Sequence, residues 1–340
     1  MDRFSFVAGS SAYDAPHMPA GTRVRYFPPA PALAPFLTAY NAYGAVDRTP
    51  RVDPFLPMMT MVTILVDAGP VSVRVRNHVY DDVPPVALYG AMTRPIVATT
   101  HGGVQIGIGI SPLGWARLVR RSAEDFHNRL VPLGSLFGPG WGERVHAELI
   151  AAESDEAIPD ILDRHFAPLL TCPHPQEALI ARLAAIVAGP STPDIATLAE
   201  EMGVTTITLR RFARRYFGMP PKQMVLRARF LRSFLRESGL DGGPPGRSIA
   251  DSYFDESHYL RDAHTFLGTT PKRFLRQPLD FLRGSVASRI RALGAAAQVL
   301  HHVDPPALTD AKAAPVVPGP TDRWPPPAPE LADPLPPPRS

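Results

Sequence analysis

Residues 192–218 read TPDIATLAEEMGVTTITLRRFARRYFG, and the pattern of this stretch indicates the fold of the C-terminal half of the chain. Thr192 and Pro193 are typical of a helix start, because a hydroxyl cap precedes a proline in the first turn. Gly203 predicts the end of that helix, and Thr205 is a suitable cap for a second one. The apolar side chains of the first helix share one face: Ile195, Leu198 and Met202. A short helix, a glycine turn and a new helix together predict a helix-turn-helix.

The second helix of this motif, 206–217, is expected to present a basic face to solvent. Its apolar stripe consists of Leu209, Phe212, Ala213 and Tyr216. In a helix-turn-helix the exposed face of the second helix enters the major groove, and residues near its N-terminus reach the bases. We therefore expect base contacts from Thr206, Ile207, Arg210 and Arg211, and phosphate contacts from Arg214 and Arg215. An ordinary amphipathic helix with a basic solvent face is the alternative.

Positive charge is concentrated around this helix. The whole chain carries a formal net charge of only +3, but residues 205–236 hold nine basic side chains and no acidic one. Like charges at this density repel one another unless a polyanion neutralises them. The charge pattern therefore favours double-stranded DNA as a partner over a merely solvated helical surface.

A second, shorter unit of the same kind follows a linker helix. Residues 221–237 place Met224, Ala228, Leu231 and Leu235 on one stripe. The glycine-rich stretch 239–246 then leads to a brief helix expected around Ile249 and a further helix from about Asp255 to Leu267. Asp255 is a suitable N-cap, and Gly268 and Pro271 follow the last helix as Gly218 and Pro220 follow the first.

The span 174–277 resembles the DNA-binding region of AraC-type transcription regulators. The matching stretches are LAEEMGVTTITLRRFARRYFGMPPKQMVLRARFL (198–231) and SYFDESHYLRDAHTFLGTTPKRF (252–274). The resemblance implies two helix-turn-helix subdomains joined by a linker helix, each presenting one helix to the major groove. By the same resemblance, contacts with DNA fall on Ile207, Arg210 and Arg211 in the first unit, and on Glu256, Ser257, His258 and Arg261 in the second.

The second unit departs from the family pattern at two positions. Ser252 stands where a glycine usually precedes the aromatic residue, and Ala263 stands where a second aromatic residue is usual. Phe266 is the residue that we expect to refill that core. These departures predict a second unit that is less stable or less specific than the first.

The N-terminal half reads as strands followed by helices. Four β-like runs, rich in Val and Ile and bounded by Gly and Pro, are MVTILVDAG (61–69), VSVRVRNHVY (71–80), VALYGA (86–91) and VQIGIGI (104–110). Residues 112–130 and 142–166 read as helices. The sequence thus predicts an α+β chain: a β-rich N-terminal domain with a sheet or small barrel and helices, followed by an all-α C-terminal domain with two helix-turn-helix units.

The expected organisation has five parts. They are a flexible N-terminus (1–21), a mixed β/α sensing or dimerisation domain (22–171), the DNA-binding domain (174–280), an extra helix (281–303) and a disordered, proline-rich tail (304–340). The stretches LYGAMTRP (88–95) and IGIGISPLGWARLVRRSAEDFHNRLVPLGSLFG (106–138) resemble the poorly characterised N-terminal region of a subset of AraC-type regulators. That resemblance implies a small-molecule effector or a homodimer contact there, and contact with RNA polymerase for the whole chain.

Enzymatic chemistry finds little support in the sequence. Cys172 is the only cysteine, which excludes a multi-cysteine zinc site, and the glycines at 102–109 do not form a dinucleotide-binding fingerprint. We expect no catalytic residues, no metal and no cofactor, no membrane span, and a cytoplasmic location. The alternative function is a small-molecule-binding protein or enzyme whose basic helices bind RNA or a protein partner.

Overall fold

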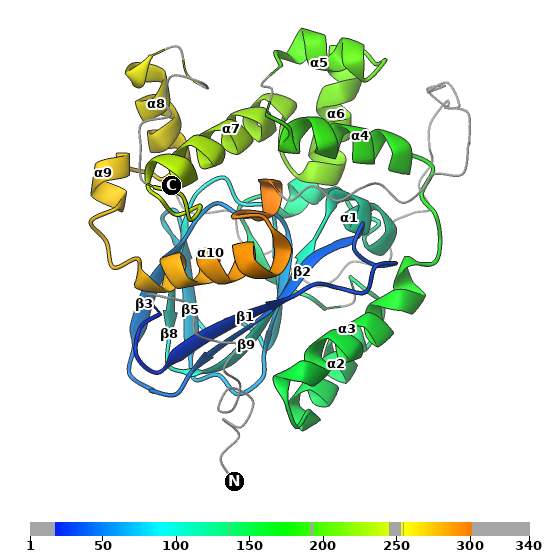
Figure 1. Cartoon of the computed structure of the whole chain (residues 1–340). Helices are drawn as coiled ribbons and strands as arrows, with labels where there is room; N and C mark the ends of the chain where they lie inside the picture. Colours follow the sequence, from blue (N-terminus) through cyan, green and yellow to red (C-terminus); the bar gives the residue numbers. More distant parts are fainter. Residues whose placement is uncertain (1–17, 135, 191–192, 245–252, 254, 301–340) are drawn as a thin grey trace. The chain divides into compact units, whose positions relative to one another are not determined.

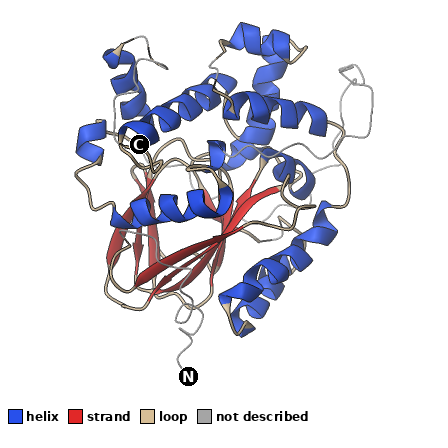
Figure 2. Cartoon of the chain, in the orientation of Figure 1, coloured by secondary structure: helices blue, strands red, loops and turns tan. Residues whose placement is uncertain are grey.

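The computed structural model describes residues 18–134, 136–190, 193–244, 253 and 255–300, and shows an α+β architecture (Figures 1 and 2). All ten strands that it describes lie within residues 22–132, in two antiparallel sheets. Helices dominate the remainder (Figure 2). The expected order of a β-rich part followed by an all-α part is therefore the order in the structure. The flexible N-terminus, the brief helix around Ile249 and the proline-rich tail fall largely or wholly outside the described residues.

The larger sheet has six strands in the order β1-β2-β9-β4-β7-β10. Strand β2 pairs with β9 over most of its length, with Tyr40 opposite Ile108, and both side chains are fully buried. The regular recurrence of Val and Ile in these runs suits a sheet that is packed on both faces. The strands are β1 (Thr22–Phe27), β2 (Leu37–Ala45), β4 (Met61–Leu65), β7 (Val86–Tyr89), β9 (Gly103–Ile110) and β10 (Leu130–Pro132).

The smaller sheet has four strands in the order β3-β8-β5-β6. Val71, Val73 and Val75 alternate with more exposed residues and point into a core of their own. This period of two is the pattern of a strand with one buried face. The strands are β3 (Arg51–Phe55), β5 (Val71–Val75), β6 (His78–Tyr80) and β8 (Ile96–Thr100).

One helix predicted from the sequence is wrong in its length. Residues 112–130 do not form a single helix but α1 (Pro112–Leu118), the 3-10 helix η3 (Ala123–Phe126) and the start of β10. The indole Nε1 of Trp115 donates a hydrogen bond of 3.0 Å to the carbonyl of Arg121, which turns the chain back on α1. Ser122 then caps η3 through its hydroxyl, and such a local cap competes with helix continuation.

The helices after β10 follow the predicted segments more closely. The helix expected over 281–303 is shorter in the structure: α10 ends at Leu293, where Gly294 takes a φ of +71°. It packs along β1, with the hydroxyls of Tyr26 and Ser285 3.0 Å apart (Figure 1). The elements are α2 (Trp141–Ala151), η4 (Asp155–Ala157), α3 (Ile158–Phe166), η5 (Ala167–Leu170), α4 (Glu177–Ala188), α5 (Ile195–Glu201), α6 (Thr206–Phe217), α7 (Pro221–Glu237), α8 (Glu256–Phe266), α9 (Pro271–Phe274), α10 (Asp280–Leu293) and η7 (Gln298–Leu300).

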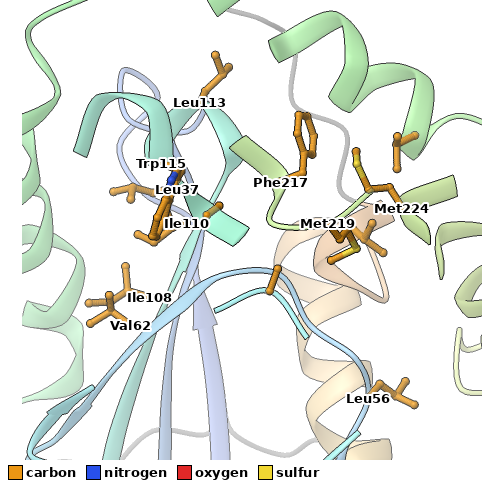
Figure 3. Packing of buried hydrophobic residues seen from close by; sticks show 14 of the residues in the cluster. Leu37, Leu56, Val62, Ile108, Ile110, Leu113, Trp115, Phe217, Met219 and Met224 are labelled. Atoms are coloured by element: carbon orange, nitrogen blue, oxygen red, sulfur yellow. The ribbon is translucent and has the colours of Figure 1, made fainter. Parts of the chain in front are cut away.

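A single hydrophobic core joins the N-terminal strands to the C-terminal helices. Figure 3 shows Leu113 and Trp115 of α1 close to Phe217, Met219 and Met224 of the α6–α7 region. The described residues up to Leu300 belong to one compact unit. The division at residues 171–174 into a sensing domain and a DNA-binding domain stays a prediction.

Candidate DNA-binding interface

Helices α5 and α6 form a helix-turn-helix whose ends are fixed by side-chain caps. The cap of α5 is Asp194, which accepts hydrogen bonds from the backbone amides of Ala196 (2.8 Å) and Thr197 (3.1 Å). The prediction of Thr192 as this cap is therefore wrong; an aspartate next to the helix accepts the same amide bonds. Gly203 adopts a φ of +67°, as the turn requires, and Thr205 caps α6 by accepting from the amide of Thr208 at 3.1 Å.

Helix α6 turns its basic side chains outward. Leu209 and Ala213 are completely buried, whereas Ile207 on the opposite side is 67% exposed. The four arginines of the helix are all exposed and Thr206 is half-buried: Arg210, Arg211, Arg214 and Arg215. The structure thus brings the six residues proposed for the first unit onto the solvent side of one helix. Four guanidinium groups without an acid on the same helix make this a strongly basic exposed face.

The far end of α6 contacts the N-terminal half of the chain. Arg214 Nε lies 3.4 Å from a carboxylate oxygen of Glu124 in η3, with both side chains about half exposed. Gly218 ends the helix with a φ of +76°, and a Cβ at that position would lie 3.1 Å from the carbonyl oxygen of Ala123. Sequence reasoning missed Glu124, because a pairing across this distance along the chain leaves no local signal.

The linker helix α7 buries the predicted stripe, and it buries an arginine as well. Met224, Ala228, Leu231 and Leu235 are at most 1% exposed. Arg227 is only 2% exposed and donates hydrogen bonds from Nη1 to the carbonyls of Met92 (2.9 Å) and Met58 (3.2 Å). Burial lowers the pKa of its guanidinium to about 10.

The nine basic residues of 205–236 therefore do not all lie on the exposed surface. Besides Arg227, Arg229 pairs with Asp262 at 2.6 Å, and Arg232 donates to the carbonyls of Ala188 and Gly189. Arg229 and Arg232 tie α7 to α8 and to the end of α4, and Arg227 ties it to two loops of the N-terminal half. The charge density that favoured DNA is carried by the exposed members of the run: Arg210, Arg211, Arg214, Arg215, Lys222 and Arg236.

Helix α8 presents a mixed polar face. Asp255 caps it by accepting from the amide of His258 at 2.8 Å, and the other carboxylate oxygen lies 2.9 Å from the ring Nδ1 of the same histidine. The backbone hydrogen bond from His258 lowers the pKa of Asp255. All four residues predicted to contact DNA from this helix are exposed: Glu256, Ser257, His258 and Arg261.

A buried polar network anchors α8 to the linker helix. Tyr253 donates its hydroxyl to Asp262 at 2.8 Å, and Arg229 donates to the same carboxylate oxygen at 2.6 Å. The guanidinium of Arg229 also lies 4.2 Å from the centre of the Tyr253 ring. Burial is the main cause of the raised pKa of Tyr253, so the hydroxyl keeps its proton for this bond.

The aromatic packing around α8 explains how the unit tolerates Ala263. Phe266 is 1% exposed and stacks on Phe230 of α7 with 5.7 Å between ring centres. The second unit is also tied to the N-terminal half, since Arg94 Nη1 donates to the carbonyl of His264 at 2.7 Å. The first helix of this second unit lies outside the described residues, so the structure shows one complete helix-turn-helix and the second helix of another.

The described residues offer neither a membrane-spanning helix nor a metal site. No helix there is long and apolar enough to cross a membrane, and no group of three or more His, Cys, Asp or Glu side chains could hold a metal ion. Cys172 is exposed.

Neither a family model nor a curated protein matches the chain. Solved structures with a similar arrangement include ToxT from Vibrio cholerae, at 12% identity and a TM-score of 0.38 over 69% of this chain and 97% of ToxT. ToxT from Vibrio cholerae O395 gives 11% identity and a TM-score of 0.38 over 76% and 98% of the two chains. A third is CuxR, described as an AraC-like transcriptional activator, at 12% identity and a TM-score of 0.22 over 64% and 88%. All three of these TM-scores lie below 0.5.

Proposed function

We propose that this chain is a sequence-specific DNA-binding transcription regulator that uses α6 and α8 as its two recognition helices. The observation that carries the proposal is the exposed face of α6, where four arginines project from the second helix of a capped helix-turn-helix. Guanidinium groups in this position suit both guanine edges and backbone phosphates. The resemblance of residues 174–277 to AraC-type DNA-binding regions supports the same assignment.

The two ends of α6 have different roles in this proposal. Thr206, Ile207, Arg210 and Arg211 occupy its first turns and read base edges, while Arg214 and Arg215 hold phosphates. In the second unit Glu256, Ser257, His258 and Arg261 face the next stretch of major groove. The protein acts in the cytoplasm on its target promoters, where it contacts RNA polymerase, and its N-terminal half carries an effector site or a homodimer contact.

A different class of function makes a different prediction. If the basic helices bound RNA or a protein partner instead, affinity for duplex DNA would be weak and independent of sequence. A DNA-binding regulator binds its preferred duplex far more tightly than a scrambled one, and both affinities fall steeply with salt. Selection of a preferred site from random duplexes separates the two classes.

The decisive experiment compares two arginines of α6 on the selected and a scrambled duplex at several salt concentrations. Arg211→Ala is expected to cost about 1–3 kcal/mol on the selected duplex only, with relaxed discrimination at one base pair. Arg214→Ala is expected to weaken binding to both duplexes alike and to reduce the salt slope by roughly one unit. Arg291→Ala, an exposed arginine on α10, is the matched control and leaves binding unchanged. Equal losses on both duplexes for Arg211→Ala would remove its base-reading role.

A further inference from the structure

A cavity lies among the N-terminal half, α4, the end of α6 and α7. Its volume is about 70 Å³. Most of its wall is apolar, with Leu113 from α1, Phe217 from the last turn of α6 and Met224 from α7, and Figure 3 shows these three side chains together. A row of alanines from α4 forms another part of the wall.

Arg227 is the charged residue in this wall. Its Nη1 is occupied by the carbonyls of Met58 and Met92, but its buried Nε has no hydrogen-bond partner. Within the described part of the chain no acidic side chain forms an ion pair with Arg227.

A second polar atom of the wall is also unsatisfied. The hydroxyl oxygen of Thr38, on β2, is buried and has no hydrogen-bond partner. A cavity wall that holds both a buried cation without an anion and a buried hydroxyl without a partner is an unfavourable arrangement that a bound anion relieves. The apolar remainder of the wall requires that the same molecule carry a hydrocarbon part.

The volume limits the size of that molecule. A single water needs roughly 10–15 Å³ on this measure, so 70 Å³ accommodates a handful of non-hydrogen atoms. A carboxylate with a short aliphatic chain meets all three requirements of charge, apolar surface and size. Longer chains would need the alanines of α4 to move away from α7.

We propose that this cavity binds a short-chain organic carboxylate, with its charged group on Nε of Arg227 and its hydrocarbon part against Leu113, Phe217 and Met224. Binding itself is independent of the DNA-binding role; only its consequence rests on the proposed function. Phe217 is the last residue of α6 and Met224 belongs to the linker helix, so the occupant touches both elements that position the first recognition helix. The carboxylate is thus the effector of the regulator.

The test is calorimetric titration of the whole protein, without DNA, with acetate, butyrate, hexanoate and the uncharged analogue butyramide. Butyrate is expected to bind at least ten-fold more tightly than butyramide. Arg227→Met should abolish that preference and Arg227→Lys should retain part of it. Ala184→Met, which narrows the cavity, should weaken butyrate binding, while the same change at the exposed Ala178 of α4 should not.

The wild-type protein alone keeps the proposal falsifiable if an Arg227 variant fails to fold. Equal binding of butyrate and butyramide, or no binding of any of the carboxylates, would overturn it. A second titration measures the affinity for the selected DNA duplex with and without butyrate, and a change of three-fold or more is expected. If no duplex binds at all, the proposed function fails while the calorimetry still decides the carboxylate site.

Discussion

Helices α6 and α8 begin in the same way, each with a side-chain cap, yet they present different chemistry to solvent. Helix α6 exposes four arginines and has no acidic residue, whereas α8 exposes one arginine together with Glu256, and its other acidic residue, Asp262, is buried. The first helix suits strong, salt-dependent contact with phosphates. The second suits hydrogen bonding by a carboxylate, a hydroxyl and an imidazole, which discriminates among bases more than it attracts the backbone.

The two helices also differ in what holds them in place. Behind α6 the contacts are apolar, with Leu209 and Ala213 fully buried. Behind α8, the ion pair between Arg229 and Asp262 also holds this helix against α7. Removing one member of such a pair is strongly destabilising, because the other member is then left buried without a countercharge. The first unit therefore has its charged side chains exposed and apolar contacts behind its helix, whereas the second unit keeps an ion pair behind its helix.

The largest effect is expected from Asp262→Leu. The change leaves the guanidinium of Arg229 and the hydroxyl of Tyr253 without their acceptor, and we expect a loss of about 3 kcal/mol in the free energy of unfolding. Urea denaturation measures it. Replacing both partners, with Arg229→Met added to Asp262→Leu, should recover most of that loss, since no charge is then buried alone. If the double variant were as unstable as the single one, the unpaired charge of Arg229 would not be the cause of the loss.

An intermediate loss of stability is expected when alanine replaces either of the glycines that follow the two recognition helices, and the loss should differ between them. Gly218 and Gly268 both have positive φ, +76° and +72°. Alanine at Gly218 would also press its Cβ on the carbonyl of Ala123, whereas at Gly268 the nearest atom is Nη1 of Arg94, at an ordinary contact distance of 3.6 Å. We expect losses of about 2 kcal/mol at Gly218 and about 1 kcal/mol at Gly268.

The control for these two variants is Gly203→Ala. Gly203 has a φ of +67°, and a Cβ added there would meet open space. It isolates the cost of the backbone conformation alone. Thermal or urea unfolding of the three variants gives the order directly. If Gly218→Ala cost no more than Gly203→Ala, the contact between α6 and η3 would not contribute to stability.

The smallest effect concerns the ion pair between Arg214 and Glu124. With Glu124→Gln, Arg214 no longer shares its charge with a carboxylate, and affinity for the selected duplex should rise about two- to three-fold at low salt. The gain should vanish at high salt because both side chains are about half exposed. Asp125→Asn is the matched control: it removes the neighbouring charge, which pairs with Arg121 instead. Filter binding at two salt concentrations measures both variants, and an equal gain from the control would contradict the pairing.

Local signals predicted several helix ends correctly, although not the start of α5. Thr205 and Asp255 are the caps of α6 and α8, and Gly218 ends α6 in the left-handed conformation, because each of these depends on only a few neighbouring residues. The stripe of α7 followed from its spacing. The same spacing held a signal for Arg227, three residues after Met224 and four before Leu231 on one face of the helix, but its charge argued for solvent.

Contacts between distant segments were not predictable in this way. Nothing near Ala123 indicates that its carbonyl lies against Gly218, and Glu124 carries no mark of its pairing with Arg214. The helix expected over 112–130 failed for the same reason. Its last residues join β10, and Leu130 pairs with Tyr89 of β7, a partner that periodicity within a window cannot indicate.

The two carbonyls that receive Arg227 belong to residues 169 and 135 positions earlier in the chain. The ribosome therefore makes both acceptors long before it makes the donor. While α7 is being synthesised, a folded N-terminal half can already offer the carbonyls of Met58 and Met92, and the linker helix docks on that half after it has folded. In a circularly permuted chain that begins at the linker helix, this order is reversed. The apolar face of α7 would then stay exposed until the segments that cover it have been synthesised.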